Sequence, residues 1–146
     1  MASLKSLLLS TLFSLGPLFR TASAQTESAS CAIPSWTIDD VQISFRNPTQ
    51  ANFTLTNLVT KTTEDISCRL EFATLCEIRG TPLDKSLYIH FQARNEDVWF
   101  NVTTPFTCDG RAGQVTGIGE KLFECPDDFY KCSAGEIDVV GEFWEW

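Results

Sequence analysis

The sequence predicts an all-β fold, a single compact antiparallel β-barrel or sandwich stapled by disulfides. Three observations lead to this class: short segments with an apolar residue at every second position, six cysteines within 146 residues, and the lack of any long stretch of helical periodicity. The alternating segments recur at about the 8 to 12 residue spacing that is typical of antiparallel sandwiches and barrels. No linker or internal repeat divides the sequence, so we expect one domain.

The first three segments cover residues 41–45, 53–59 and 66–72. In each of them, apolar side chains alternate with polar ones, as expected for strands with one buried face. The turn-forming residues Asn47-Pro-Thr-Gln50 lie between the first segment and the second.

Four more segments follow, at residues 87–91, 98–102, 114–118 and 137–143. The turn-like residues 94–97 separate the first two of these, which predicts a hairpin. A barrel would close the sheet and fill its small interior with the inward side chains. The predicted inward set is Val41, Ile43, Phe53, Leu55, Leu70, Phe72, Leu87, Ile89, Phe91, Phe100 and Val102.

The charge of the chain limits its partners. Residues 25–146 contain 9 basic and 19 acidic side chains, which gives a net charge of −10. Phosphate binding needs clustered lysine and arginine, so this composition argues against a nucleic-acid partner. A polybasic patch for a membrane surface is lacking for the same reason.

The N-terminus follows the pattern of a secretory signal peptide. A short cationic start, residues 1–5, precedes an apolar run over residues 6–19. Ala22-Ser-Ala24 supplies the small side chains that signal peptidase accepts, so we place the cleavage before Gln25. A membrane anchor is the alternative, but the run is shorter than the ~20 residues that a bilayer requires. We therefore expect a signal peptide at 1–24, a single β-rich domain at 25–146, and a secreted, extracellular protein.

All six cysteines lie in the expected mature domain. They are Cys31, Cys68, Cys76, Cys108, Cys125 and Cys132. An even number of cysteines in an oxidising compartment predicts three disulfides. Zinc binding is the alternative, but the sequence has no Cys-x-x-Cys pair and only one histidine, His90, so we predict no metal site.

Two acceptor sequons for N-glycosylation occur, at Asn52-Phe-Thr54 and Asn101-Val-Thr103. In both, the asparagine alternates with apolar neighbours, so a strand would place it on the face opposite the core. We therefore predict glycans on Asn52 and Asn101.

Several short motifs follow one another in a recognisable order. They are Ser30-Cys31, Trp36-x-Ile38, Phe53-x-Leu55, Ile66-Ser-Cys68 followed by Cys76, Gly117 eight residues before Cys125, and Asp128-Phe-Tyr-Lys-Cys132. This order resembles the Alternaria major-allergen-like family of small fungal secreted β-barrel proteins. The chain departs from the family pattern in the short gap between Cys68 and Cys76, and in Cys108, which has no family counterpart.

The resemblance implies two local bridges, Cys68–Cys76 and Cys125–Cys132, on an all-β scaffold. The short separations of these pairs agree with it, since short loops are the easiest to close. Cys31 then remains for Cys108, although pairing of Cys31 between two subunits is an alternative for the third bridge. The resemblance further implies a factor that acts at the interface with a host, commonly a plant, as an effector, elicitor or allergen, and not as an enzyme of known type.

The sequence offers little for catalysis. Triads and two-histidine ribonuclease chemistry need a poised imidazole, and His90 is expected on an outward strand face, where a histidine without a chemical role is the simpler interpretation. A glycosidase needs two carboxylates across a cleft. The adjacent acid pairs do not provide this, because neighbours on a strand point to opposite faces. We predict no catalytic residue, no enzyme activity and no cofactor.

Outward aromatic residues are the better candidates for function. If Phe100 is in the core, Trp99 points outward, and Tyr88 and His90 share an outward face on the preceding strand. Aromatic side chains give a large contact area at low entropy cost, so we predict a partner-binding surface at Tyr88, His90 and Trp99. Trp144 and Trp146, among the C-terminal glutamates, are further outward candidates.

Together these features predict a secreted, disulfide-stabilised interaction protein, monomeric or weakly dimeric, whose partner is an unidentified extracellular host protein. The alternatives are a carrier that holds a small apolar ligand inside the barrel and, third, a hydrolase of cell-wall polysaccharides.

Overall fold

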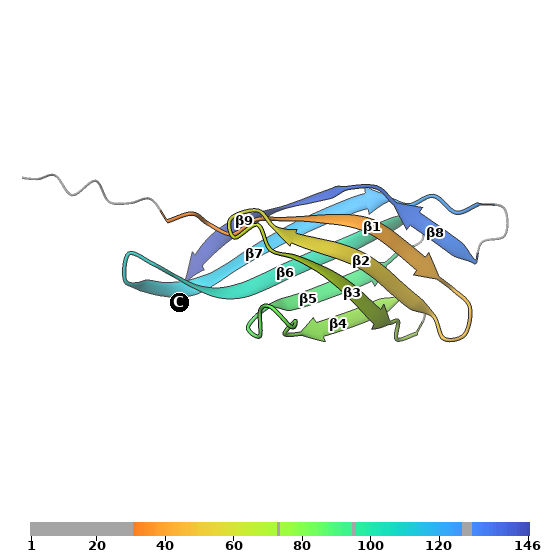
Figure 1. Cartoon of the computed structure of the whole chain (residues 1–146), viewed down its shortest axis with the longest axis horizontal. Helices are drawn as coiled ribbons and strands as arrows, with labels where there is room; N and C mark the ends of the chain where they lie inside the picture. The colour runs from red at the N-terminus through yellow and green to blue at the C-terminus, as the bar shows by residue number, and fades with distance from the viewer. Residues whose placement is uncertain (1–30, 73, 95, 127–129) are drawn as a thin grey trace, which may run out of the picture.

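The structure, a computed structural model, describes residues 31–72, 74–94, 96–126 and 130–146. The expected signal peptide at 1–24 lies outside these residues. Within them the chain forms nine antiparallel strands (Figure 1). They are β1 (Trp36–Ser44), β2 (Gln50–Asn57), β3 (Thr63–Arg69), β4 (Leu75–Arg79), β5 (Tyr88–Ala93), β6 (Asp97–Cys108), β7 (Arg111–Leu122), β8 (Lys131–Ala134) and β9 (Ile137–Glu145).

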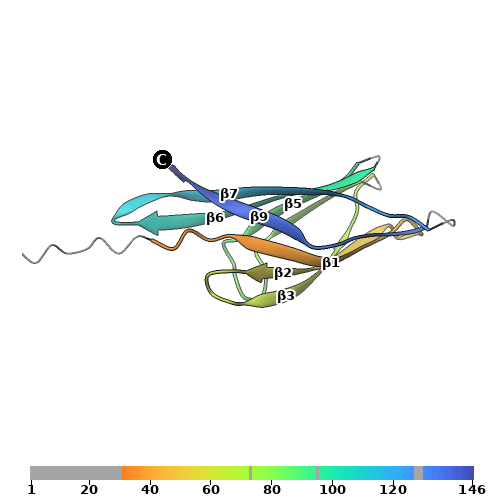
Figure 2. The same ribbon diagram turned by 90° about the horizontal axis from the view of Figure 1, so that it is seen from above.

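Eight of these strands form a nearly closed barrel in the order β3-β2-β1-β9-β7-β6-β5-β4. The short β8 pairs with the second half of β1, and β9 pairs with its first half. Seen from above, β1, β2 and β3 curve away from the layer made by β5, β6, β7 and β9 (Figure 2). The predicted all-β barrel is thus confirmed. Among the described residues, no helix is long and apolar enough to cross a membrane.

The barrel closes at a seam between β3 and β4, the two ends of the strand order. No ladder of backbone pairs joins these two strands in the described part of the chain. Instead, the Cys68–Cys76 disulfide connects them near one end. Near the other end, Thr81, which follows β4, donates a hydrogen bond from Oγ1 to Oε1 of Glu64 in β3 at 2.6 Å. The seam is therefore held by side chains at both ends.

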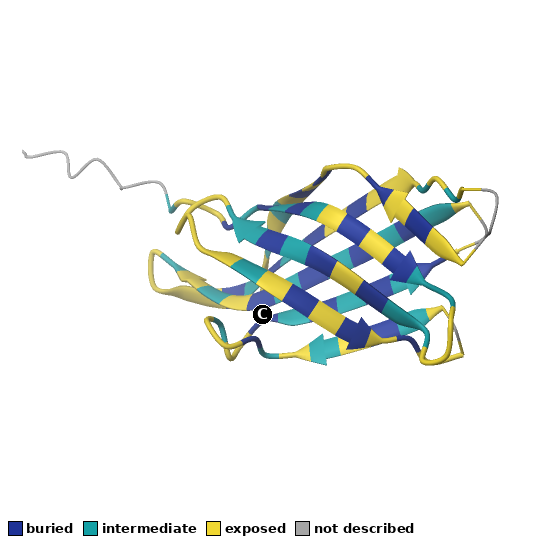
Figure 3. Cartoon of the chain, turned by 45° about the vertical axis from the view of Figure 1, so that its right-hand side comes forward, coloured by how far each residue is buried: buried dark blue, intermediate teal, exposed yellow. Residues whose placement is uncertain are grey.

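The core lies inside the barrel and follows the alternation of the strands, which Figure 3 shows as regular bands of buried residues. Three phenyl rings pack on one another at its centre: Phe53 lies 5.0 Å from Phe100 and 6.1 Å from Phe91, and Phe91 lies 4.9 Å from Phe100, between ring centroids. Ten of the eleven predicted core residues are buried, all except Phe72.

Phe72 is a wrong prediction, because its side chain is 93% exposed. β3 ends at Arg69, and the chain then reverses in a tight turn in which the Glu71 amide donates to the Leu75 carbonyl at 2.6 Å. Phe72 has a φ of 50°, so it adopts the left-handed conformation and not an extended one. The alternation that buries Cys68 and Leu70 therefore stops before it reaches Phe72.

The first strand starts five residues earlier than the predicted segment and adds two core residues, Trp36 and Ile38. A shift of register between Asp39 and Gln42, where Asp40 has a φ of 53°, marks a β-bulge. The extra residue puts Trp36 and Ile38 on the same inward face as Val41, although their spacing breaks period two.

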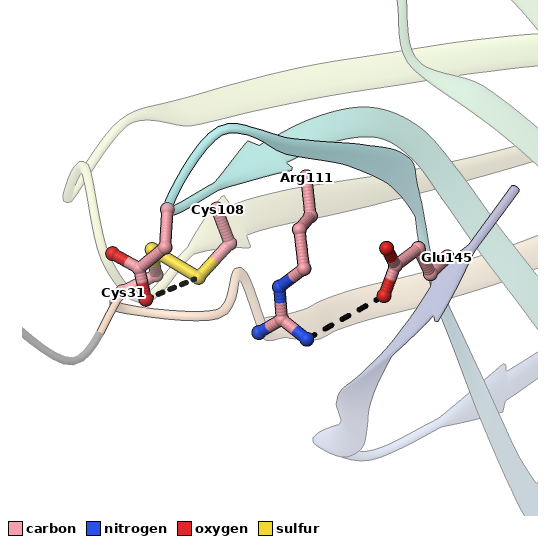
Figure 4. The surroundings of a disulfide bond; sticks show 5 residues. Cys31, Cys108, Arg111 and Glu145 are labelled. Carbon is pink, nitrogen blue, oxygen red and sulfur yellow. Dashed lines mark hydrogen bonds and ion pairs between the residues drawn. A yellow bond between two sulfur atoms is a disulfide. The ribbon is translucent and has the colours of Figure 1, made fainter.

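The structure contains the three predicted disulfide bonds, Cys31–Cys108, Cys68–Cys76 and Cys125–Cys132. All three join cysteines of the same chain. The third bridge predicted, Cys31–Cys108, fastens the segment before β1 to the end of β6 (Figure 4). Beside it, the Arg111 guanidinium donates to Oε2 of Glu145 at 3.4 Å, which links the start of β7 to the end of β9.

Candidate functional site

The three side chains predicted to bind a partner lie on the outer face of β5 and β6. The predicted hairpin is present: Tyr88 pairs with Thr103, His90 with Asn101, and Gln92 with Trp99. Because Ile89 and Phe91 point into the core, Tyr88 and His90 point outward. All three candidate side chains are half-buried by their neighbours on the face.

The imidazole of His90 packs against the indole of Trp99. The ring centroids are 5.4 Å apart and the planes meet at 80°, an edge-to-face contact. On Trp99, the guanidinium carbon of Arg94 lies 5.3 Å from the ring centroid, at cation–π distance. Arg94 is itself 3.9 Å from an Asp97 carboxylate oxygen, so the residues around Trp99 hold one another in place.

Glu77 on β4 connects His90 with Tyr88. Its Oε1 lies 3.8 Å from Nδ1 of His90, and its carboxylate also accepts a hydrogen bond from the Tyr88 phenol. Arg79 lies 3.7 Å from Glu77 and 5.7 Å from the centre of the Tyr88 ring. We call Glu77, Tyr88, His90, Arg94 and Trp99 the aromatic cluster.

Partial burial raises the pKa of the Tyr88 phenol above its ordinary value of 10.0. The hydrogen bond to Glu77 and the negative charge of Glu77 raise this pKa further, while Arg79 lowers it. Because the pKa of Tyr88 is higher in the folded than in the unfolded state, its protonated phenol contributes to the stability of the fold. This contribution is fully present below pH 10 and is lost as the pH rises through the pKa of the folded state.

Replacing Glu77 with glutamine is expected to lower the pKa of Tyr88 toward 10.0, because the change removes the charge that disfavours the phenolate. The phenolate absorbance of the protein, titrated with and without Tyr88→Phe, gives the Tyr88 contribution by difference. An identical Tyr88 pKa in the protein and in Glu77→Gln would show that the Glu77 contact does not exist in solution.

The same outer face continues across β7 and β9, where it becomes apolar. Asn101 pairs with Ile118, and Ile118 pairs with Val140. Ile118, Val140 and Trp144 are exposed, and together with Thr116 and Glu142 they line a hollow of about 300 Å³. We call these five residues the β7/β9 hollow.

Ile118 and Val140 are candidate residues that the sequence did not indicate. The alternating pattern predicts both strands but not their faces, because β7 inverts the usual pattern: glycines 117 and 119 point inward and Ile118 points outward. A Cβ at Gly117 or Gly119 would clash with Val139, so the interior has no room for larger residues there. The sequence Gly117-Ile118-Gly119 was the signal that could have indicated an outward isoleucine between two inward glycines. Trp144, which the sequence did indicate, is outward as expected.

Both glycosylation sequons lie on strands, with their asparagines on the outer face as predicted. Asn52 on β2 is exposed and accepts a hydrogen bond from Gln50 at 3.1 Å. Asn101 on β6 is half-buried, and its Oδ1 accepts a hydrogen bond from Oγ1 of Thr103, also at 3.1 Å. The presence of glycans on them stays a prediction.

Two other parts of the described chain bring together groups that can line a ligand site. Cys31, Cys108 and Asp109 bring ligand atoms within 4.8 Å of one another, but the two sulfur atoms are joined in a disulfide and offer no thiolate to a metal. At the end of the barrel, a hollow of about 180 Å³ is lined by Trp36, Leu55, Glu64 and neighbouring residues. None of the three packed phenyl rings lines this hollow.

Comparisons with known protein families, with curated proteins and with solved structures find no match to this chain.

Proposed function

We propose that this chain is a secreted interaction protein that acts at the interface with a host, as an effector, elicitor or allergen-like factor, and that it is not an enzyme. A barrel with three disulfides is consistent with an extracellular protein, because such bonds persist in oxidising compartments. The observation that carries the proposal is the aromatic cluster on the outer face of β5 and β6.

The aromatic cluster suits protein recognition because its rings are already held in place. His90 and Arg94 fix the indole of Trp99, and Glu77 contacts both Tyr88 and His90. A side chain that is ordered before binding loses less entropy when a partner covers it. The cluster also offers tyrosine, tryptophan and arginine, the residue types that most often dominate the binding energy of interfaces.

The packing of the barrel counts against the carrier alternative. Phe53, Phe91 and Phe100 occupy the centre of the interior, where a small apolar ligand would have to lie. The hydrolase alternative has no support from the acid pair at Asp39 and Asp40, which forms the bulge of β1. We therefore place the function on the outer surface.

Replacing Trp99 with alanine is expected to weaken partner binding while leaving secretion and disulfides unchanged. The fold should lose about 1 kcal/mol, because the half-buried indole packs with His90 and Arg94 on the outer face and not in the core. The test infiltrates purified protein into candidate host tissue and compares the partners that chemical crosslinking recovers. Trp146→Ala, which removes another outward indole, is the matched control.

Loss of a crosslinked partner with Trp99→Ala but not with Trp146→Ala would support the aromatic cluster as the binding surface. If both variants still recovered the partner as well as the unchanged protein does, the binding surface would lie elsewhere. A large fall in the melting temperature of Trp99→Ala would mean that the indole belongs to the core.

A further inference from the structure

The β7/β9 hollow brings together three exposed apolar side chains of this sheet face. Ile118 is 56% exposed, Val140 68% and Trp144 57%, and they line one hollow. Contiguous exposed apolar residues on a protein surface commonly mark a place that something covers. The two polar members, Thr116 and Glu142, pair across the strands within the same hollow.

The Asn101 sequon lies on the strand beside this hollow. Asn101 pairs with Ile118, which pairs with Val140, so the three residues form one row across β6, β7 and β9. The next row contains Thr103, Thr116 and Glu142, and Oγ1 of Thr103 lies 3.2 Å from Oγ1 of Thr116. Adjacent strands are about 4.8 Å apart, so a sugar attached to Asn101 reaches Ile118 directly and Val140 with little further extension.

The hollow has the chemistry that binds a pyranose ring. A sugar presents apolar C–H groups on its ring face and hydroxyl groups at its rim. Ile118, Val140 and Trp144 offer an apolar and aromatic surface to the ring face, and the exposed Glu142 carboxylate can accept hydrogen bonds from hydroxyl groups. The opposite side of Asn101 is less suited, because His90 and Trp99 already cover each other there.

We infer that the β7/β9 hollow binds the chain's own N-linked glycan: the first N-acetylglucosamine on Asn101 packs on Ile118 and Val140. The covalent link gives this sugar a high effective concentration at the hollow, so a shallow site is sufficient to hold it. The inference rests on the secretion assumed in the proposed function, since N-glycans are added in the secretory pathway. A glycan in this position leaves the aromatic cluster uncovered.

The test expresses the full chain in a glycosylating secretory host. Intact mass gives the occupancy of each sequon, and hydroxyl-radical oxidation followed by peptide mass spectrometry reports the exposure of Ile118, Val140 and Trp144. We expect oxidation of these residues to be severalfold slower in the glycosylated protein than in Asn101→Gln. Asn52→Gln, which removes the other sequon, should oxidise at the rate of the unchanged protein.

Two enzymatic treatments of the folded protein avoid any effect of substitution on folding. Trimming the glycan to a single N-acetylglucosamine should retain the protection, whereas complete removal of the glycan should abolish it. Equal oxidation with and without the glycan would overturn the inference, as would an empty Asn101 in secreted protein that carries a glycan on Asn52.

Other occupants of the hollow give distinct results. Protection of Asn101→Gln by added chitobiose, without protection by the attached glycan, would make the hollow a site for external saccharides and refute the inference. Protection that grows with protein concentration would assign the hollow to a second copy of the chain and refute it too. Each result is independent of the Trp99→Ala crosslinking test. A failure of the inferred glycan contact can therefore be distinguished from a failure of the proposed function.

Discussion

Replacing Phe100 with alanine is expected to lower the free energy of unfolding by about 3 to 5 kcal/mol, the range for deleting a buried phenyl ring. Phe100 is fully buried and contacts both Phe53 and Phe91 through its ring, so the cavity left behind would lie at the centre of the core. Denaturation by urea with the disulfides intact, followed by tryptophan fluorescence, measures the loss.

Phe72→Ala is the matched control, because it makes the same chemical change at a side chain that the structure leaves exposed. Its expected effect is within about 0.5 kcal/mol of zero, as for most surface substitutions. The period-two pattern alone predicts large losses for both variants. A large loss with Phe72→Ala would therefore show that in solution β3 continues beyond Arg69 and buries Phe72.

Removing the Cys31–Cys108 disulfide is expected to destabilise the protein by about 4 kcal/mol, because a bridge that closes a long loop restricts the unfolded chain most. The two cysteines are 77 residues apart in sequence, against 7 for Cys125 and Cys132. Double alanine variants of each pair, unfolded by urea without reductant, allow the comparison.

The Cys125–Cys132 variant should lose less, about 2 to 3 kcal/mol on the same loop-closure argument. If this variant proved the less stable of the two, local packing around the buried Cys132 would outweigh loop length. A Cys31→Ala variant that migrates as a monomer where the unchanged protein forms a reducible dimer would contradict the intramolecular bridge itself.

The sequence predicted seven of the nine strands and missed β4 and β8. The missed strands have five and four residues. In β8 only Cys132 and Ala134 face inward, and in β4 Cys76 and the half-buried Ile78 do. Two inward positions do not establish an alternation, so their strand conformation depends on the neighbours that pair with them: β5 for β4, and β1 for β8.

The long hairpin of β6 and β7 contains a turn signal in its sequence that predicts a longer pairing than the alternating segments do. The predicted segments ended at Val102 and began at Gln114, whereas the paired strands meet at Cys108 and Arg111. The two residues between them, Asp109 and Gly110, have φ values of 51° and 77°, and Asp-Gly is a strong two-residue hairpin signal. Local turn chemistry therefore determines this part of the fold.

The aromatic cluster was predictable only in part. Alternation around Phe100 and Ile89 was enough to place Trp99, Tyr88 and His90 on the outside. The contacts that hold Tyr88 and His90 come from Glu77 and Arg79, which lie on β4, a strand that the sequence did not reveal. Residues contributed by a neighbouring strand depend on register, which a single sequence specifies weakly for short strands.

The seam between β3 and β4 gives the redox state of the protein a consequence for its solubility. Sheet edges with unpaired backbone groups act as templates on which strands of other chains can add, and a closed barrel avoids this by hiding its edges. Here two such edges face each other, and the Cys68–Cys76 bond supplies the covalent part of the closure. In a reducing cytosol this bond would be lost and only the backbone pair Glu71–Leu75 would still hold this end together, so we expect strand addition by other chains to begin at β3 and β4.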